Sequence, residues 1–148
     1  MPTTFLRLIP QDHFYIPDKT GQYLAESLLK KHFDDNQIEM ITSDTIDFID
    51  QGENFESVSC NLCGQKIQID HWQDEMDKAY KKQFEDLTFV TSCCYKKTSL
   101  NELLYKWPAG FAKFVLSITN PDSEISEDDL KELQILLTTP LRLIWARY

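Results

Sequence analysis

The stretch of sequence that decides the fold is FAKFVLSITNPDSEISEDDLKELQILLTTPLRLIWARY, which forms residues 111–148. Apolar and polar side chains alternate from 112 to 118, and this spacing is typical of a half-buried strand. A capping box that begins at Ser126 is followed by leucines at helical spacing, until Pro140 ends the helix. The apolar residues 141–148 are predicted to form a final strand, so the whole stretch reads strand, helix, strand.

The first part of the chain repeats this order of elements. Its apolar and amphipathic segments predict a strand, a helix and a second strand, at residues 5–9, 21–33 and 37–42 respectively. Asp18 or Thr20 is placed to cap the helix. Residues 45–49 alternate as a strand does, and they are expected to extend or follow the second strand.

The two strand–helix–strand units predict the α+β class and, within it, the split βαβ arrangement of ferredoxin-like folds. Right-handed crossovers would place both helices on one face of a four-stranded antiparallel sheet. A chain of 148 residues can bury one hydrophobic core, so residues 1–148 are expected to form a single domain. In this prediction the halves 1–50 and 111–148 form the sheet, and residues 51–110 are inserted between them.

The insert differs in character from the two halves. Its short segments of β character are residues 55–59, 66–69 and 87–91. Its two predicted helices are residues 72–84 and 99–104. Asp70 with Gln73 is predicted to cap the first helix, and Ser99 with Glu102 forms a capping box for the second. The segment 107–110, Trp-Pro-Ala-Gly, is expected to end the second helix in a rigid bend.

All four cysteines of the chain lie in this insert, within a stretch of 35 residues. Cys60 and Cys63 have C-x-x-C spacing with Gly64 directly after them, whereas Cys93 and Cys94 are adjacent. The spacing lets a tight turn aim both sulfur atoms at one point, and the glycine lets backbone N–H groups approach the thiolates. In a reducing compartment such a cluster indicates a metal site before a set of disulfides. We therefore predict one structural zinc ion, bound by these four cysteines in a zinc-ribbon-like insert.

The adjacent pair imposes a condition on this site. Neighbouring residues point in opposite directions along a regular strand, so Cys93 and Cys94 can share a metal only where the strand ends. Residues 95–98 are expected to provide the turn, and Lys96 and Lys97 would offset the negative charge of four thiolates. A site closed by four thiolates leaves no position for water. Its role would be to stabilise the insert, by roughly 10 kcal/mol of binding free energy coupled to folding.

Three alternative interpretations of the cysteines are less consistent with the pattern. A redox C-x-x-C pair typically lies at a helix N-terminus in a βαβ unit, but here it lies between two short segments of β character. A disulfide between Cys93 and Cys94 would be strained. In a mixed site, His71 would replace one of these adjacent cysteines as the metal ligand and leave a spare thiol.

The balance of charge bears on the kind of partner. The formal net charge is −9 and the pI is about 4.7, which disfavours binding to nucleic acids and to anionic membranes. A basic protein partner would suit this surface, although net charge also serves solubility. The N-terminus has no charged region before an apolar stretch, and no apolar run approaches the length of a membrane span. A cytoplasmic location is therefore expected.

Other candidates for chemistry are weaker than the cysteines. His71 and Glu75 are four residues apart on the predicted helix, but a solvated charged face explains them better. An enzyme would have to draw catalytic groups from these two residues, from His13 or from the Trp107 loop, in a cleft between insert and sheet. The chain contains no nucleophile elbow, phosphate loop or dinucleotide fingerprint, so a non-enzymatic role is favoured.

Two further surfaces bear on how the chain would recognise a partner. Partial exposure of Trp107 in its rigid bend would indicate a contact surface, whereas a buried Trp107 would pack the insert onto the sheet. Nucleic-acid binding through the zinc module would need a basic patch, drawn from Lys78, Lys81, Lys82, Lys96 and Lys97.

Four segments together resemble a family of short bacterial proteins described only as hypothetical. These segments are Cys60-Asn61-Leu62-Cys63-Gly64, Trp72–Ala79, Cys93-Cys94 and Trp107–Phe111. The resemblance runs from about residue 50 to the C-terminus. It implies a bacterial cytosolic origin and a zinc-binding role for the cysteines, and it implies no activity and no catalytic residues.

The closed cysteine site, the acidic surface and the absence of catalytic motifs predict a non-enzymatic, zinc-stabilised domain that binds another protein. A regulatory or toxin-neutralising role would fit the small size and the acidity. An enzyme with a cleft beside the zinc module and a nucleic-acid-binding protein remain the alternatives at this point.

Overall fold

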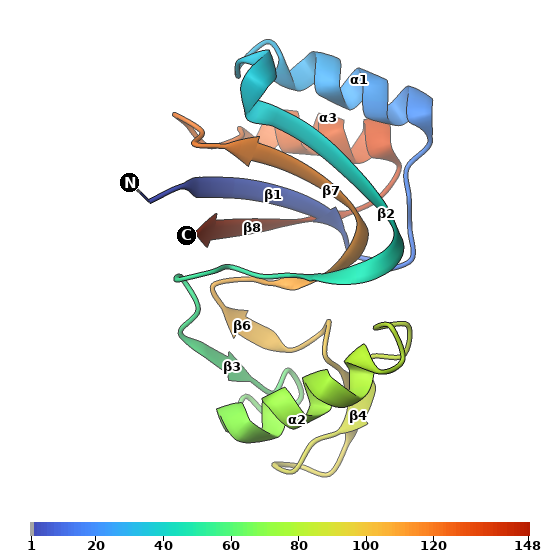
Figure 1. Ribbon diagram of the computed structural model, residues 1–148, viewed down its shortest axis with the longest axis vertical. Helices are drawn as coiled ribbons and strands as arrows, with labels where there is room; N and C mark the ends of the chain where they lie inside the picture. Colours follow the sequence, from blue (N-terminus) through green and yellow to red (C-terminus); the bar gives the residue numbers. More distant parts are fainter. Residues whose placement is uncertain (1) are drawn as a thin grey trace.

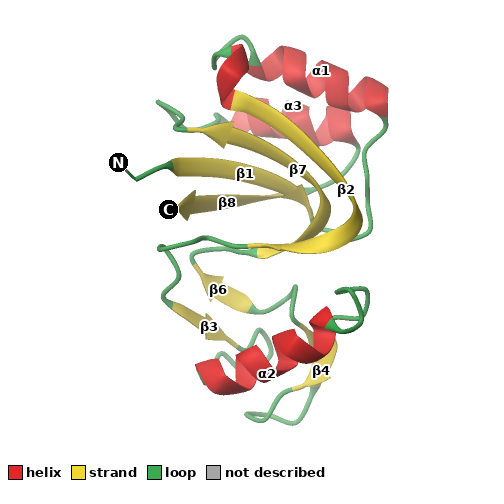
Figure 2. Cartoon of the chain, viewed as in Figure 1, coloured by secondary structure: helices red, strands yellow, loops and turns green. Residues whose placement is uncertain are grey.

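The structure, a computed structural model, describes residues 2–148 and has the predicted α+β class (Figures 1 and 2). The helices are α1 (Lys19–Leu29), α2 (Ile69–Tyr80), α3 (Glu127–Leu137) and the short 3₁₀ helix η1 (Asp35–Gln37). The strands are β1 (Thr4–Pro10), β2 (Ile38–Ile49), β3 (Ser57–Ser59), β4 (Thr88–Val90), β5 (Lys97–Ser99), β6 (Leu104–Lys106), β7 (Gly110–Thr119) and β8 (Leu141–Arg147). Within the described range, none of the helices is both long and apolar enough to cross a membrane.

Strands β2, β7, β1 and β8 form the main sheet in that order, and every neighbouring pair is antiparallel. Strand β7 therefore separates β1 from β2, and β1 separates β7 from β8. Helices α1 and α3 lie side by side on one face of this sheet (Figure 1). The two strand–helix–strand segments thus interleave their strands in a single sheet.

The core between the helices and the sheet is formed by fully buried side chains from both layers. They are Leu6, Leu8, Phe114, Leu116 and Ile118 from the strands and Ala25, Leu29, Leu133 and Leu137 from the helices. On each strand these residues are two positions apart, and on each helix they are four apart, so each set lines one face. Burial of one leucine side chain stabilises the fold by roughly 2 kcal/mol, so this layer of contacts holds the helices on the sheet.

The predicted helix starts in the two halves are confirmed by their caps. The carboxylate of Asp18 accepts a hydrogen bond from the Gly21 N–H at 2.6 Å, whereas Thr20 lies inside α1. The hydroxyl of Ser126 accepts one from the Asp129 N–H at 3.1 Å. Each bond pairs a backbone donor that the first helical turn cannot satisfy by itself.

The chain leaving β2 closes the sheet along the outer edge of β8. Gly52 forms a parallel bridge with Arg147, whose carbonyl accepts a hydrogen bond from the Glu53 N–H at 2.8 Å. Strand β2 curves toward this edge and has an irregular register between Thr42 and Asp47 (Figure 1). The second face of the sheet therefore packs around a small apolar core of its own, which consists of Ile9, Ile49, Ala112, Val115 and Ile144.

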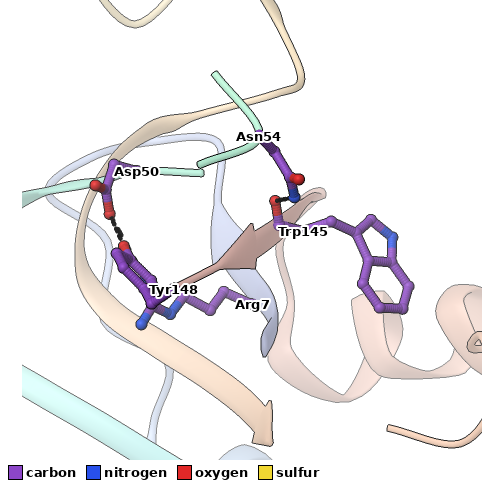
Figure 3. A network of polar contacts seen from close by, with 5 residues as sticks. All are labelled: Arg7, Asp50, Asn54, Trp145 and Tyr148. Carbon is purple, nitrogen blue, oxygen red and sulfur yellow. Dashed lines mark hydrogen bonds and ion pairs between the residues drawn. The ribbon is translucent and has the colours of Figure 1, made fainter. Parts of the chain in front are cut away.

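Polar contacts between side chains reinforce this closure (Figure 3). The Tyr148 hydroxyl donates to the carboxylate of Asp50, and the Arg7 guanidinium lies 3.8 Å from the same carboxylate. The side-chain amide of Asn54 donates to the Trp145 carbonyl at 3.0 Å. The segment after β2 is thus attached to β1 and to the C-terminal strand by side chains as well as by its backbone.

The middle of the chain packs around a third core below the main sheet (Figure 2). This middle segment contains α2 and the two-stranded sheets β3–β6 and β4–β5. Phe48 and Phe111 reach this core from the main sheet, with their ring centroids 5.0 Å apart. The indole of Trp72 stacks on Phe55 at 5.8 Å and donates to the Tyr105 hydroxyl at 3.2 Å. Aromatic packing therefore joins the middle segment to the sheet.

A buried asparagine forms a polar joint between these two parts. The side-chain oxygen of Asn101 accepts hydrogen bonds from the Phe111 N–H at 3.2 Å and from Arg142 at 3.1 Å. Its amide nitrogen donates to the Gln11 carbonyl at 3.1 Å. Because Asn101 is buried, loss of these bonds would leave polar groups unpaired in the interior. The joint therefore favours one orientation of the two parts.

The predicted helix at 99–104 is wrong. Ser99 pairs with Thr88 in β5, and Leu104 pairs with Ser59 in β6. A six-residue helix gains little stability of its own, whereas strand pairing at both ends lets the intervening leucines enter the core.

The helix predicted at 72–84 is shifted toward the N-terminus. It begins at Ile69 with Gln68 as its N-cap residue, and no side chain caps it, so the predicted cap by Asp70 and Gln73 is wrong. The helix ends early because Gln83 and Phe84 both have positive φ. Phe84 is turned into the core under the sheet by this change of direction.

Gly52 offers a test of the closure of the sheet. Its φ is +58°, and a Cβ atom there would collide with the Arg147 carbonyl oxygen, so Gly52→Ala is expected to destabilise the fold by about 2–4 kcal/mol. The free energy of unfolding in urea measures this effect. Gly64→Ala is the matched control, because its φ is +77° but nothing lies near the added methyl, and about 1 kcal/mol is expected. Equal losses in the two variants would show that the contact between Gly52 and Arg147 is not required.

Candidate metal centre

The structure brings the four predicted ligand cysteines together in one cluster. The sulfur atoms of Cys60, Cys63, Cys93 and Cys94 all lie within 4.8 Å of one another. The sulfur atoms of Cys60 and Cys94 are 3.9 Å apart, and those of Cys63 and Cys93 are 3.3 Å apart. All four are free thiols, of which Cys60 is buried and Cys63 is exposed. Four sulfur atoms at this spacing could bind a metal ion.

The first pair of cysteines lies in a tight loop, the first knuckle (residues 60–65). The Cys60 N–H donates to the Gln65 carbonyl at 2.9 Å, and the Gly64 N–H donates to the Cys60 carbonyl at 2.9 Å. Gly64 has a φ of +77°, which favours glycine at this position. The Leu62 N–H donates to the Cys60 sulfur at 3.3 Å. Backbone donors therefore approach the thiol of the C-x-x-C motif, as the sequence predicts.

The adjacent cysteines lie in a second loop, the second knuckle (residues 91–96), between β4 and β5. The Thr91 N–H donates to the Lys96 carbonyl at 3.0 Å, and the Tyr95 N–H donates to the Thr91 carbonyl at 3.0 Å. Tyr95 has a φ of +56°. The turn therefore begins four residues before the predicted one at 95–98, and both cysteines lie inside it. Because the strand has already ended, both sulfur atoms can face the cluster.

The hydrogen bonds of the two knuckles correspond residue by residue. In this register Thr91 takes the place of Cys60, and Cys93 takes the place of Leu62. The buried Thr91 hydroxyl lies 3.1 Å from the Cys94 sulfur. The second knuckle thus has Thr91 at the position of Cys60. Its additional cysteine, Cys93, occupies the position of Leu62, whose side chain is half exposed in the first knuckle.

Thr91 is a residue of the site that sequence reasoning missed. The signal is present when residues 60–66, CNLCGQK, are written above residues 91–97, TSCCYKK. The second cysteine and the final lysine of each segment then align. Only the hydrogen bonds of the folded loops show that this alignment is the structural one.

Contacts outside the cluster fix the two knuckles relative to each other. The Thr98 hydroxyl donates to the side-chain oxygen of Asn61 at 2.7 Å, which joins strand β5 to the first knuckle. Beneath the cluster, Val58, Ile67 and Phe89 belong to the buried core of the middle segment. The cysteine positions therefore depend on the packing of the middle segment as well as on the loops that carry them.

The thiols differ in how readily they ionise. Burial opposes ionisation of Cys60, but the backbone N–H groups of Leu62 and Cys63 and the neighbouring thiols together lower its pKa from 9.0 to about 7. The backbone N–H of Gln65 favours the Cys63 thiolate, but the Cys93 thiol and burial outweigh it and raise the pKa of Cys63 to about 11. Four thiols this close cannot all ionise unless a cation neutralises them.

The other predicted site residues on α2 lie outside this cluster. The His71 ring packs 6.2 Å from the Phe89 ring, and its buried Nε2 has no hydrogen-bond partner among the described residues. Glu75 is paired with Lys78 at 3.2 Å. His71 and Glu75 line two different grooves, so the structure does not bring them together as an acid–base pair.

The remaining candidates are dispersed over the molecule. His13 Nε2 is 3.1 Å from the Glu85 carbonyl. His32, the third histidine of the chain, is not one of the candidates, and it pairs with Asp129 at 3.0 Å. Trp107 is 41% exposed, so it is not a core residue of the sheet. Lys78 and Lys82 are engaged by acidic side chains of their own segment.

Comparisons with known proteins do not extend this picture: no protein-family model, no curated protein and no solved structure matches the chain. The resemblance to short bacterial proteins stays a prediction. The geometry of the site is therefore the basis for a functional assignment.

Serine substitutions test the cluster as a metal site. Each of Cys60→Ser, Cys63→Ser, Cys93→Ser and Cys94→Ser is expected to reduce the metal content from one ion per chain to near zero. The free energy of unfolding should fall by several kcal/mol in each variant, because metal binding and folding are coupled. Elemental analysis and urea unfolding measure the two effects, with His71→Ala as the control that keeps its metal. Retention of the metal by Cys93→Ser together with its loss in His71→Ala would establish a mixed site instead.

Metal binding at this site should release protons in a pH-dependent way. The thiolate is the ligand, so each thiol that is still protonated must lose its proton when the metal binds. More protons should therefore be released at about pH 6 than at about pH 9, and affinity should fall as the pH falls. Calorimetric titration in buffers of different ionisation enthalpy counts these protons. A count that does not change with pH would exclude thiols as the ligands.

Proposed function

We propose that this chain is a non-enzymatic, zinc-stabilised domain that binds another protein. The observation that carries the proposal is the closed cluster of four cysteine sulfur atoms. The proposed role of this binding is regulation of the partner, for example neutralisation of a toxin.

The geometry of the cluster supports zinc as its metal. Zinc–sulfur bonds of about 2.3 Å in a tetrahedron separate the sulfur atoms by about 3.8 Å. The sulfur atoms of Cys60 and Cys94 are 3.9 Å apart, and those of Cys63 and Cys93 would separate slightly from 3.3 Å. Four thiolates complete the coordination of zinc and leave no open position, so the ion would hold the two knuckles together and would not activate water.

The local charge also supports a tetrathiolate site. Four thiolates around one divalent ion carry a net charge of −2. The segments 57–69 and 87–101, which contain both knuckles, include Lys66, Lys96 and Lys97 and no acidic residue. Of the 24 acidic residues of the chain, 15 lie in residues 1–50 and 111–148, and the other nine lie in the middle segment outside the segments 57–69 and 87–101. The two knuckle segments therefore carry only positive side-chain charges apart from the thiolates, which would offset the net charge of the site.

We propose further that the main sheet is a ferredoxin-like split βαβ sheet. The strand order β2–β7–β1–β8, its antiparallel pairing and the placement of α1 and α3 on one face support this assignment. In this view the halves 1–50 and 111–148 form the sheet, and the zinc-binding insert 51–110 is a module carried by it.

Exposed apolar side chains on the module support a protein partner. Leu62 and Tyr95 lie at the tips of the two knuckles and are 47% and 82% exposed, and Trp107 is 41% exposed at the end of β6. Large side chains of this kind are the usual anchors of protein interfaces. A zinc ion that holds both knuckle tips in place would reduce the entropy that is lost on binding.

Alanine substitutions at these anchors test the proposal. The tagged wild-type protein is used to capture partners from the cells that naturally produce it, and the partner is then titrated against purified variants. Leu62→Ala combined with Tyr95→Ala is expected to weaken binding by about 30-fold or more, because hot-spot residues contribute at least about 2 kcal/mol. Trp107→Ala tests the other end of the module. Tyr23→Ala is the matched control, since Tyr23 is 69% exposed on α1.

Unchanged affinity in the double variant and in Trp107→Ala would place the interface elsewhere. Turnover of a substrate that depends on His71 or Glu75 would contradict the non-enzymatic assignment.

A further inference from the structure

The four cysteines of the centre form two unlike pairs. The inner pair is Cys60, which is fully buried, and Cys94, which is partly exposed and whose sulfur lies 3.1 Å from the Thr91 hydroxyl. The outer pair consists of the exposed Cys63 and the partly exposed Cys93, with sulfur atoms only 3.3 Å apart. The pairs therefore differ in access to solvent through Cys63 and Cys60, and the sulfur atoms of the outer pair are closer together, at 3.3 Å against 3.9 Å.

The origin of this inequality is the second knuckle. A regular pair of knuckles would supply the fourth ligand from the position of Thr91, which is only 1% exposed. The chain supplies it instead from Cys93, at the position that Leu62 occupies in the first knuckle, and Cys93 is partly exposed where Thr91 is buried. One ligand of the centre is thus displaced toward the solvent.

A groove of about 430 Å³ leads to this displaced ligand. It is lined by Gln65, Lys66, Ile67, Gln68, His71, Ser92 and Cys93, and Cys93 is the one cysteine among them. Its polar lining residues include a lysine and a serine, and no acidic residue. Such a groove can admit a small polar oxidant and supply hydrogen bonds to its oxygen atoms.

We propose that the outer pair is a modification site for hydroperoxides, at which Cys93 is oxidised first and Cys63 completes a disulfide. The proposal rests on the zinc centre proposed above, because the disulfide removes two of the four ligands and releases the ion. The inner pair alone would not retain zinc, and Thr91 cannot replace a thiolate.

The reaction balances with a hydroperoxide as the only oxidant. The Cys93 thiolate attacks the terminal peroxide oxygen, the O–O bond breaks, and the leaving alkoxide or hydroxide takes a proton from solvent. The product is a sulfenic acid on Cys93. The Cys63 thiolate then attacks the Cys93 sulfur, the S–O bond breaks, and hydroxide leaves and is protonated to water. The two sulfur atoms together lose the two electrons that the peroxide gains.

The test uses the intact, zinc-loaded chain and hydrogen peroxide as the probe. Zinc is counted before oxidation, its release is followed with a chromogenic chelator, and the disulfide is located by fragment mass spectrometry. We expect complete release of zinc, a bond between Cys63 and Cys93, and recovery of the zinc-bound form with dithiothreitol and zinc. Retention of zinc in peroxide, or first oxidation at Cys60 or Cys94, would overturn the proposal.

The two proposals fail in distinguishable ways. A chain that contains no zinc before oxidation contradicts the proposed zinc centre. The order in which the four thiols are oxidised still tests the outer pair in that case, since it depends on exposure and on the groove. A chain that holds zinc but shows no preference for Cys93 contradicts only the modification site.

A double substitution provides the sharpest control. Thr91→Cys combined with Cys93→Ser gives the second knuckle the C-x-x-C spacing of the first and moves the fourth thiolate to a buried position. This variant is expected to bind one zinc ion and to release it about tenfold more slowly in peroxide, because thiolate reactivity falls with loss of access. Release at the wild-type rate from a variant that has bound zinc would show that the position of Cys93 does not govern oxidation.

Discussion

The pairing of β7 with β1 on one side and β2 on the other is the interaction on which the rest of the structure depends. Strand β7 is buried along almost its whole length. Its side chains Phe114, Leu116 and Ile118 enter the core under α1 and α3, whereas Phe111 enters the core of the middle segment. One strand therefore supports both parts of the molecule. A charged side chain on either face would remove burial that these parts need.

The cysteine cluster lies in the middle segment, and its geometry follows from the similarity of two loops. Two loops of the same backbone form, separated by α2, direct their thiols at one point because each loop begins and ends in a short antiparallel pairing. Positive φ at Gly64 and Tyr95 turns each loop at the equivalent position. The difference between the loops is chemical: one has cysteine and the other threonine at the buried position. A nearly symmetric scaffold thus carries an asymmetric set of ligands.

The asymmetric set of ligands would affect both the stability of the module and the reactivity of its cysteines. A closed thiolate site would stabilise the module by coupling metal binding to folding, and it would present both knuckle tips as a rigid surface. The same site leaves the outer ligand pair more exposed to solvent than the inner pair, because Cys63 is exposed and Cys60 is buried. A partner that covered the knuckle tips would also cover the outer pair, so binding and oxidation would compete for the same face of the module.

The sequence by itself determined the elements whose signals are local. The alternation in β7, the caps at Asp18 and Ser126, and the cysteine spacing all depend on residues that are near each other in the chain. Tertiary structure decided the rest. The two ends of the segment 99–104 joined strands β5 and β6 because Thr88 and Ser59 were available as pairing partners, and the closure by Gly52 needed the edge of β8. The place of Cys93 in its knuckle was decided by hydrogen bonds that form only when the loop is folded, because spacing alone does not say which residues of a turn face inward.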